Sequence, residues 1–137
     1  MADLLSDLRP GEAWHGEGVL HLPGFADAAE VWAALQPVLK AAPFRHLVTP
    51  GGKTMSVSMT NCGRVGWVSD RLGYRYQAMD PLSEKPWPDM PDALRDVAVR
   101  AATAFGAADF APDACLINCY EVGARLTPHQ DRDEQDL

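Results

Sequence analysis

The chain has 137 residues, of which 47% are hydrophobic and 23% charged, a balance typical of a soluble globular protein and not of a disordered one. No apolar run approaches the roughly 18 residues of a membrane span, and the N-terminus is acidic where a secretion signal would be basic. We therefore expect one cytoplasmic, monomeric domain over residues 1–137 without a membrane partner, and the net charge of −7 argues against a uniformly basic nucleic-acid-binding surface.

The N-terminal third predicts one short strand and one helix. Residues 18–22 resemble a strand that ends before Pro23 and Gly24. Asp27 is a typical helix N-cap, and apolar residues follow it at helical spacing to about Ala41. Pro37 lies inside this helix and is expected to kink or weaken it.

The middle of the chain predicts strands. Residues 54–60 form the clearest one, because three apolar side chains alternate strictly with polar ones. Residues 50–52 and 61–63 predict turns on either side, and a second strand follows through Trp67. Tyr74 and Tyr76 share one face of a third extended segment.

The C-terminal half predicts a helix and a further strand. Pro91 suits the first turn of the helix, and Gly106 is expected to end it. Residues 114–120 alternate as a strand, with Asn118 and Tyr120 on one face and the cysteines on the other. The sequence thus predicts two helices beside several strands.

The motif that points most directly to chemistry is His129-Gln130-Asp131. On an extended strand, His129 and Asp131 would point the same way, because strand side chains repeat with a period of two. An imidazole and a carboxylate are two of the three ligands in the 2-His-1-carboxylate triad that holds non-haem Fe(II). A single H-x-D string is close to chance in a chain of this length.

Other residues have two open interpretations. Asn118 and Tyr120 are either hydrogen-bond donors in a polar pocket or a satisfied polar pair at a strand end. Trp67, Tyr74 and Tyr76 either stack on a nucleobase within a basic part of the chain or pack as core aromatics. The three cysteines form no C-x-x-C pair and are interpreted as reduced, buried thiols.

Several longer strings closely resemble the AlkB family of DNA-alkylation-repair dioxygenases. They include Thr49-Pro50-Gly51-Gly52, Met59-Thr60-Asn61-Cys62-Gly63, Lys85-Pro86-Trp87-Pro88, Cys115-Leu116-Ile117-Asn118 and His129-Gln130-Asp131. The match is collinear over essentially the whole chain. The resemblance implies an α+β fold, with an N-terminal β/α extension and the first part of a double-stranded β-helix (jelly roll), truncated before the barrel closes.

The resemblance also implies a role for individual residues. Matching positions make His129 and Asp131 iron ligands, Asn118 and Tyr120 contacts to 2-oxoglutarate, and Trp67 a wall of the pocket for a flipped-out base. By the same matching, Tyr74 contacts the nucleic-acid backbone with Tyr76 beside it, Asp133 meets the exocyclic amino group of the base, and Thr49 to Thr54, with Lys53 among them, form a mobile cover over the substrate.

The implied reaction is oxidative demethylation of 1-methyladenine or 3-methylcytosine, mainly in single-stranded DNA, with Fe(II), 2-oxoglutarate and O2 and with release of formaldehyde. Two departures matter. The distal His and two Arg residues of the family have no counterpart, and Lys53 stands where an aromatic residue is expected. We therefore expect this chain alone to be inactive or nearly so. The alternatives are a related oxygenase acting on double-stranded DNA, RNA or protein, and a non-catalytic single-stranded nucleic-acid-binding fragment.

Overall fold

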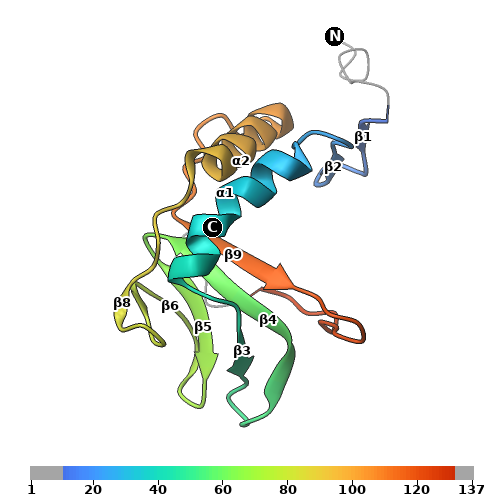
Figure 1. Ribbon diagram of the computed structural model, residues 1–137. Helices are drawn as coiled ribbons and strands as arrows, with labels where there is room; N and C mark the ends of the chain where they lie inside the picture. Colours follow the sequence, from blue (N-terminus) through green and yellow to red (C-terminus); the bar gives the residue numbers. More distant parts are fainter. Residues whose placement is uncertain (1–10, 132–137) are drawn as a thin grey trace.

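The computed structural model describes residues 11–131, which form two helices and a set of short antiparallel strands (Figure 1). The helices are α1 (Ala28–Ala41) and α2 (Asp92–Phe105). The strands are β1 (Ala13–Trp14), β2 (Leu20–His21), β3 (Arg45–Val48), β4 (Thr54–Gly63), β5 (Gly66–Asp70), β6 (Gly73–Gln77), β7 (Met79–Asp80), β8 (Lys85–Pro86) and β9 (Ala114–Cys119). Neither described helix combines the length and hydropathy needed to cross a bilayer.

The helix ends follow the capping signals in the sequence. Oδ1 of Asp27 accepts hydrogen bonds from the backbone N–H groups of Ala29 and Glu30, at 2.9 and 3.2 Å, and α1 then continues through Pro37. Helix α2 ends at Gly106, whose φ of 107° is the left-handed conformation that glycine adopts without strain. Pro91 is the N-cap of α2 and not its first helical residue, so the predicted start is wrong by one position.

The helices pack on one face of a three-stranded sheet of order β3-β4-β9 (Figure 1). Val38 of α1 and Leu94 of α2 pack with Cys62 of β4 and with Cys115 and Ile117 of β9. The opposite face carries a second apolar cluster, formed by Leu47, Val57 and Met59. The predicted alternation over residues 54–60 is therefore confirmed, since Val57 and Met59 share this second face.

The predicted turn over residues 61–63 is wrong, because β4 extends to Gly63. Pairing with β9 continues to the end of the strand, where Gly63 lies opposite Ala114. Gly63 has a φ of 114°, and a Cβ built there would lie 2.5 Å from the carbonyl oxygen of Asp113. Only glycine fits such a position, so this residue allows the pairing to close at its end.

Strands β5 and β6 form a separate two-stranded sheet that carries the aromatic residues. In its register Trp67 lies opposite Tyr76, and Ser69 lies opposite Tyr74. The α+β prediction is confirmed as a mixture of two helices and antiparallel strands. The predictions of a single domain and of a barrel that does not close stay predictions.

Candidate active site

Trp67 and Tyr74 form a stacked pair on the β5–β6 hairpin. Their ring centroids are 5.5 Å apart and their planes are inclined by 17°. They are diagonal neighbours across the ladder, a separation that large aromatic side chains span. Tyr74 is 46% exposed, so this ring is open to a further flat group, whereas Tyr76 is half-buried.

Asn61 holds the backbone of Trp67 in place, a role that the sequence analysis missed. Its Nδ2 donates to the carbonyl oxygen of Trp67 at 2.9 Å, and its Oδ1 accepts from the N–H of Trp67 at 3.0 Å. Asn61 is only 2% exposed. The sequence pattern that could have predicted this role is the spacing of Asn61 two residues after Met59. This spacing places the amide of Asn61 on the same buried face of the strand, where a polar group needs a hydrogen-bond partner.

Strand β9 presents Asn118 on the same face of the sheet as the second apolar cluster. Asn118 lies opposite Met59 in the register, and residues opposite each other share a face. Asn118 and Tyr120 are both exposed, whereas Cys115 and Ile117 pack toward the helices, as the alternation predicted. An exposed amide and an exposed phenol are free to donate hydrogen bonds to a carboxylate ligand.

His129 and Asp131 converge after β9. Nε2 of His129 lies 3.4 Å from Oδ1 of Asp131, and their side chains are 58% and 82% exposed. Residues 120–131 are irregular, so the predicted extended strand is wrong although the two side chains still meet. Nδ1 of His129 lies 2.9 Å from the carbonyl oxygen of Thr127, which places the ring proton of a neutral imidazole on Nδ1. Nε2 is then left with its lone pair.

This arrangement fits two neighbouring ligands of one metal ion. Two donors at about 2.1 Å from a small ion and at right angles to each other lie about 3 Å apart, close to the observed separation. The hydrogen bond from Nδ1 to a carbonyl is the usual way in which a ligating histidine is oriented. Within residues 11–131 no third His, Cys, Asp or Glu joins this pair.

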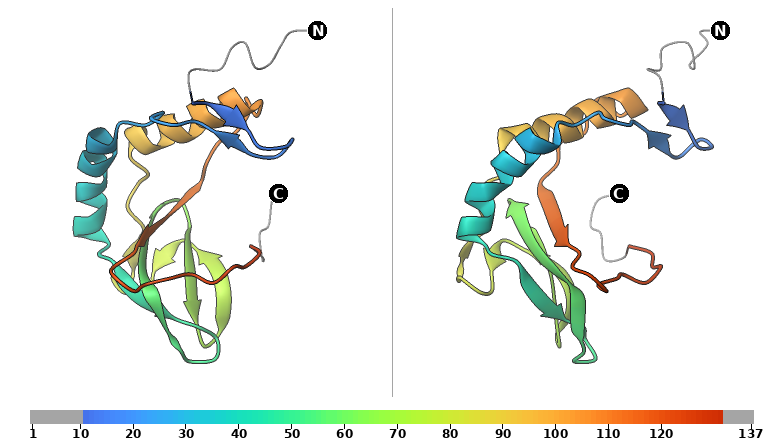
Figure 2. Two further views of the ribbon diagram at one scale, coloured as in Figure 1. Left: turned by 90° about the vertical axis from the view of Figure 1, so that its right-hand side faces the viewer. Right: turned by 45° about the vertical axis from the view of Figure 1, so that its right-hand side comes forward.

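The segment that carries His129 and Asp131 packs on the same cluster as Trp67. After β9 the chain turns back toward β4 (Figure 2), where Ser56 Oγ donates to the carbonyl oxygen of Arg125 at 3.1 Å. Ala124 and Leu126 then pack on the cluster of Leu47, Val57 and Met59, and Trp67 packs on that cluster too. One apolar cluster therefore anchors Trp67 and the part of the segment that leads to His129 on the same face of the sheet.

Residues 49–53 form the turn between β3 and β4. Thr49 Oγ1 accepts a hydrogen bond from the N–H of Lys53 at 3.1 Å. The guanidinium of Arg71 lies next to this turn, since a Cβ built on Gly52 would be 3.2 Å from Nη2 of Arg71. The turns of the β3–β4 and β5–β6 hairpins thus approach each other. Asp133, the remaining predicted site residue, lies outside the described residues.

Most of the positive charge in the middle of the chain is paired with nearby acids. Arg75 binds Asp70 through two hydrogen bonds of 2.9 and 2.8 Å, and Arg64 binds Asp113 at 3.1 Å. The hydrogen bonds from Arg75 lower the pKa of Asp70 below its ordinary value of 3.8. Charge alone is therefore a weak argument for nucleic-acid binding by this surface.

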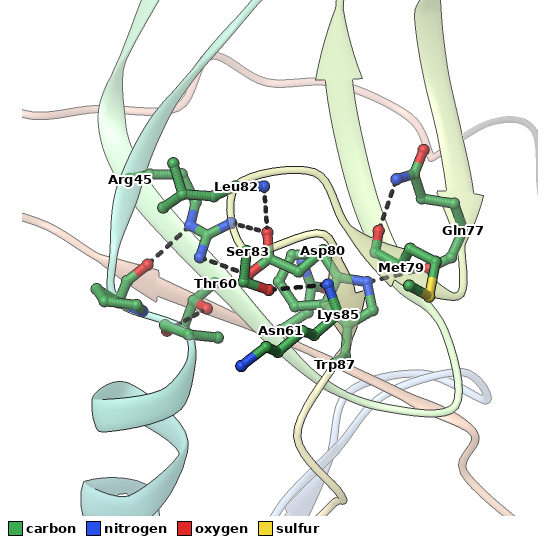
Figure 3. Close-up of polar contacts among 12 residues, drawn as sticks. Arg45, Thr60, Asn61, Gln77, Met79, Asp80, Leu82, Ser83, Lys85 and Trp87 are labelled. Atoms are coloured by element: carbon green, nitrogen blue, oxygen red, sulfur yellow. Dashed lines mark hydrogen bonds and ion pairs between the residues drawn. The ribbon is translucent and has the colours of Figure 1, made fainter.

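Arg45 and Asp80 form the most buried of the described ion pairs (Figure 3). Arg45 donates to the two carboxylate oxygens at 2.6 and 3.0 Å, and Asp80 is 1% exposed. Burial opposes ionisation of Asp80, but the hydrogen bonds from Arg45 and from the N–H of Leu82 outweigh it and lower its pKa below 3.8. The Arg45 guanidinium also lies 5.3 Å from the ring centroid of Trp87, so the pair is part of the packing beneath the hairpin.

The three cysteines are free thiols and do not group with other ligands in residues 11–131. Cys62 and Cys115 lie opposite each other across β4 and β9. A hydrogen bond from Cys62 to Cys115, together with burial, raises the pKa of Cys62 above its ordinary value, and the same bond lowers the pKa of Cys115 to about 7. Cys115 packs toward the helices and away from Asn118, as the alternation predicted. Cys62 is buried, but Cys115 and Cys119 are only half-buried, so the interpretation of these two as buried thiols is wrong.

Comparison with known proteins gives consistent matches. The family model for the 2OG-Fe(II) oxygenase superfamily matches residues 18–137. The chain is 50% identical to the alpha-ketoglutarate-dependent dioxygenase AlkB of Escherichia coli K12 and 49% identical to that of Salmonella typhimurium LT2, in each case over 139 residues. It is 46% identical over 117 residues to an AlkB homolog of Caulobacter vibrioides, with 83% of this chain and 51% of that protein covered. The chain spans 64% of the length of the first two relatives.

Proposed function

The chain belongs to the 2OG-Fe(II) oxygenase superfamily and is of the AlkB type, and on this premise we propose that the protein removes N-methyl groups from nucleobases in DNA. The superfamily implies Fe(II), 2-oxoglutarate and O2 as cofactor and cosubstrates. The observation that carries the proposal is the packing of the Trp67–Tyr74 pair and of the His129–Asp131 segment on one cluster. A base-stacking surface and a metal-binding pair are the two parts that such a reaction needs side by side.

We assign the metal-binding role to His129 and Asp131. Nε2 of His129 would bind iron because Nδ1 is directed to the carbonyl of Thr127, and Oδ1 of Asp131 would bind on the same side of the ion. When bound, iron with 2-oxoglutarate supplies the activation of O2 that hydroxylates the methyl group, which is then lost as formaldehyde. Asn118 and Tyr120, exposed on the neighbouring strand end, would donate hydrogen bonds to 2-oxoglutarate.

We assign base recognition to the aromatic hairpin. The ring of Trp67 would form one wall of the pocket for a base turned out of its strand, and the exposed Tyr74, with Tyr76 beside it, would contact the neighbouring backbone. A methyl group on the Watson–Crick edge weakens pairing, and a single strand needs no unpairing, so a single-stranded substrate costs least to bind. Asp133 would favour the cationic forms of 1-methyladenine and 3-methylcytosine over neutral bases.

We propose that cationic side chains contribute little to nucleic-acid binding, and that they do so only near the turns of the two hairpins. Three of the five basic residues between Phe44 and Tyr76 are held in ion pairs. Lys53 and Arg71 have no acidic partner among the residues that the structure describes, and they lie on the two neighbouring turns. We propose that these two cations contact phosphates, with Thr49 supporting the turn that carries Lys53.

A purely nucleic-acid-binding role is less well supported than catalysis. The convergence of His129 and Asp131 at 3.4 Å has no use in a binding module, whereas it fits a metal site. We also propose that these two residues alone hold iron weakly, because no third ligand joins them within residues 11–131. A preparation of these 137 residues is accordingly expected to show little turnover.

The decisive experiment measures formaldehyde release from a single-stranded oligonucleotide that contains 1-methyladenine. The protein as its gene encodes it is incubated with Fe(II), ascorbate and 2-oxoglutarate, and an unmethylated oligonucleotide serves as the control. We expect formaldehyde only with the methylated strand and only when 2-oxoglutarate is present. Binding of Fe(II) and 2-oxoglutarate without any formaldehyde from methylated DNA would contradict the proposed substrate. RNA of the same sequence, tested in parallel, separates DNA from RNA as the preferred strand.

A further inference from the structure

The geometry points to Asn61 as a positioning residue whose side-chain amide fixes the backbone of Trp67, and through it the place from which the base-stacking ring projects. Neither the family match nor the sequence pattern assigns Asn61 a role. The consequence for base recognition rests on the proposed function, whereas the positioning of Trp67 itself does not. Asn61 does not touch the substrate in this proposal and acts only through Trp67.

The first argument concerns how the hairpin is attached. Within residues 11–131, no ladder of main-chain hydrogen bonds joins β5 or β6 to the β3-β4-β9 sheet. The hairpin follows β4 directly through a two-residue turn, and beyond that turn side chains must hold it. In a continuous sheet the backbone itself sets the register of each residue, but here a small number of side-chain contacts has to do so.

The second argument is the chemistry of the Asn61 amide. It donates to the carbonyl oxygen and accepts from the N–H of the same residue, Trp67, and therefore reproduces the pair of bonds that a neighbouring strand would make. An amide has a donor and an acceptor side by side, so it satisfies both backbone groups at once. Because Asn61 is buried, loss of the amide would leave both groups of Trp67 without a partner.

Other contacts hold the hairpin at neighbouring residues, and the side chain of Trp67 packs on the cluster of Leu47, Val57 and Met59, but these contacts do not bind the backbone of Trp67. Ser69 Oγ donates to the carbonyl oxygen of Val48 at 2.7 Å, near the far end of β5. The ring of Trp87 lies against Gly66, where a Cβ would be 2.4 Å from Cε2 of that ring. Trp87 also donates from Nε1 to the carbonyl oxygen of Gln77 at 3.0 Å. Val68, at the centre of β5, also packs with Ala42 and Trp87. These contacts dock the side chains and ends of the hairpin, and the amide of Asn61 binds both backbone groups of Trp67.

The test compares two variants of Asn61 with a matched control. Asn61→Asp keeps the shape and can accept from the N–H of Trp67, but its carboxylate repels the carbonyl oxygen. Asn61→Ala removes both bonds without adding charge, and it replaces the Asp variant if that variant does not fold. Thr60→Val is the control, because Thr60 is equally buried in β4 but its hydroxyl donates to the carbonyl oxygen of Ala42 and not to a residue of the hairpin.

The first readout is hydrogen exchange of the Trp67 amide in the full-length protein. In Asn61→Ala we expect this amide to exchange at least about 10-fold faster than in Thr60→Val, at conditions chosen to match global stability. Asn61→Asp, which still accepts from this N–H, should show a smaller increase. Unchanged protection of the Trp67 amide in the Asn61 variants would overturn the proposal. This readout needs no substrate, so it decides the positioning of Trp67 whatever the outcome of the activity assay.

The second readout is binding of a single-stranded 1-methyladenine oligonucleotide in a double-mutant cycle. We expect Asn61→Ala to weaken binding about 10-fold in the wild-type background and to have no further effect in a Trp67→Ala background. Equal losses in both backgrounds would mean that Asn61 acts independently of Trp67 and would contradict the proposal. If the wild-type protein does not prefer the methylated strand, the proposed function fails, and the exchange experiment still stands.

Discussion

The aromatic hairpin and the segment that carries the candidate metal ligands are built in opposite ways, although both pack on one cluster. The hairpin depends on buried groups, with Asn61 bonded to Trp67 and the Trp87 ring packed against Gly66. The metal segment is exposed at its functional end, and Ser56 with Leu126 attaches it farther back. Substitutions at the buried contacts of the hairpin should therefore change mainly the free energy of unfolding. Substitutions in the exposed segment of His129 and Asp131 should change mainly the proposed activity.

Two carboxylates show the same contrast. Asp80, beneath the hairpin, is buried and accepts hydrogen bonds from Arg45 and Leu82, so its oxygens are already used. Asp131 is exposed, and within the described residues its contact is with His129. A carboxylate whose oxygens are all hydrogen-bonded within the protein stabilises the fold. A carboxylate with free oxygen lone pairs can bind a metal ion. The predictions below exploit this difference.

The largest effect is expected from His129→Ala. In the full-length protein, loss of the proposed iron ligand should lower the proposed release of formaldehyde by more than about 100-fold, since loss of a group that merely orients a ligand already costs 10–100-fold. The free energy of unfolding should change by less than about 0.5 kcal/mol, because the side chain is exposed. Formaldehyde release and urea unfolding measure the two quantities. Gln130→Ala is the control. A comparable loss of activity in this variant would contradict a specific role of His129 in metal binding.

The next effect concerns stability beneath the hairpin. Arg45→Met should lower the free energy of unfolding by about 3 kcal/mol, because the buried carboxylate of Asp80 then lacks its partner. Arg64→Met removes an exposed ion pair with Asp113 and should cost less than about 1 kcal/mol. Urea denaturation of the three proteins tests this ordering. Equal losses in the two variants would show that burial of the Arg45–Asp80 pair has no special effect on stability.

The stability difference between wild type and Arg45→Met should also depend on pH. The pKa of Asp80 is lower in the folded protein than its ordinary value of 3.8, so its stabilising effect is complete above about pH 4 and is lost as the pH falls through the folded-state pKa. In Arg45→Met the buried carboxylate gains from protonation. The difference in urea midpoint should therefore shrink between pH 7 and pH 3. A difference that stays constant over this range would contradict the assignment of the charge to Asp80.

The smallest effect is expected at the exposed turn between β3 and β4. Lys53→Ala should weaken oligonucleotide binding a few-fold, and it should reduce the slope of log K against log salt by about 0.7 if one phosphate contact to a single strand is lost. Stability should stay within about 0.5 kcal/mol of wild type. Lys85→Ala removes an exposed lysine outside both turns and should leave the slope unchanged. Binding titrations at several salt concentrations distinguish the two variants.

The sequence predicted elements whose signals are local. Asp27 and Gly106 carry their own capping chemistry, and the alternation over residues 54–60 needs no partner to be recognised. Asn61 was misassigned to a turn because its local neighbours favour turns, whereas pairing with residues 114–119 keeps it in the strand. That pairing spans more than fifty residues of chain and leaves no local signal.

In the candidate site, too, local sequence patterns predicted some features, and long-range contacts determine the others. The H-x-D motif identified His129 and Asp131 as a pair, but the predicted strand was wrong, because packing of Leu126 and the Ser56–Arg125 contacts shape that segment. The stacking of Trp67 on Tyr74 depends on a register that the sequence does not specify. Local patterns thus supplied the residue types, and contacts between distant segments supplied their geometry.

The attachment of the β5–β6 hairpin by side chains has a consequence for how such proteins diversify. Because no ladder of the central sheet runs through this hairpin within the described chain, its outward residues can be exchanged without shifting a neighbouring strand. The residues that attach it, Gly66, Val68 and Ser69, and the amide of Asn61 in β4 have to be retained. The proposed base preference could therefore be altered by substitutions in the hairpin alone, without changing the segment that carries His129 and Asp131.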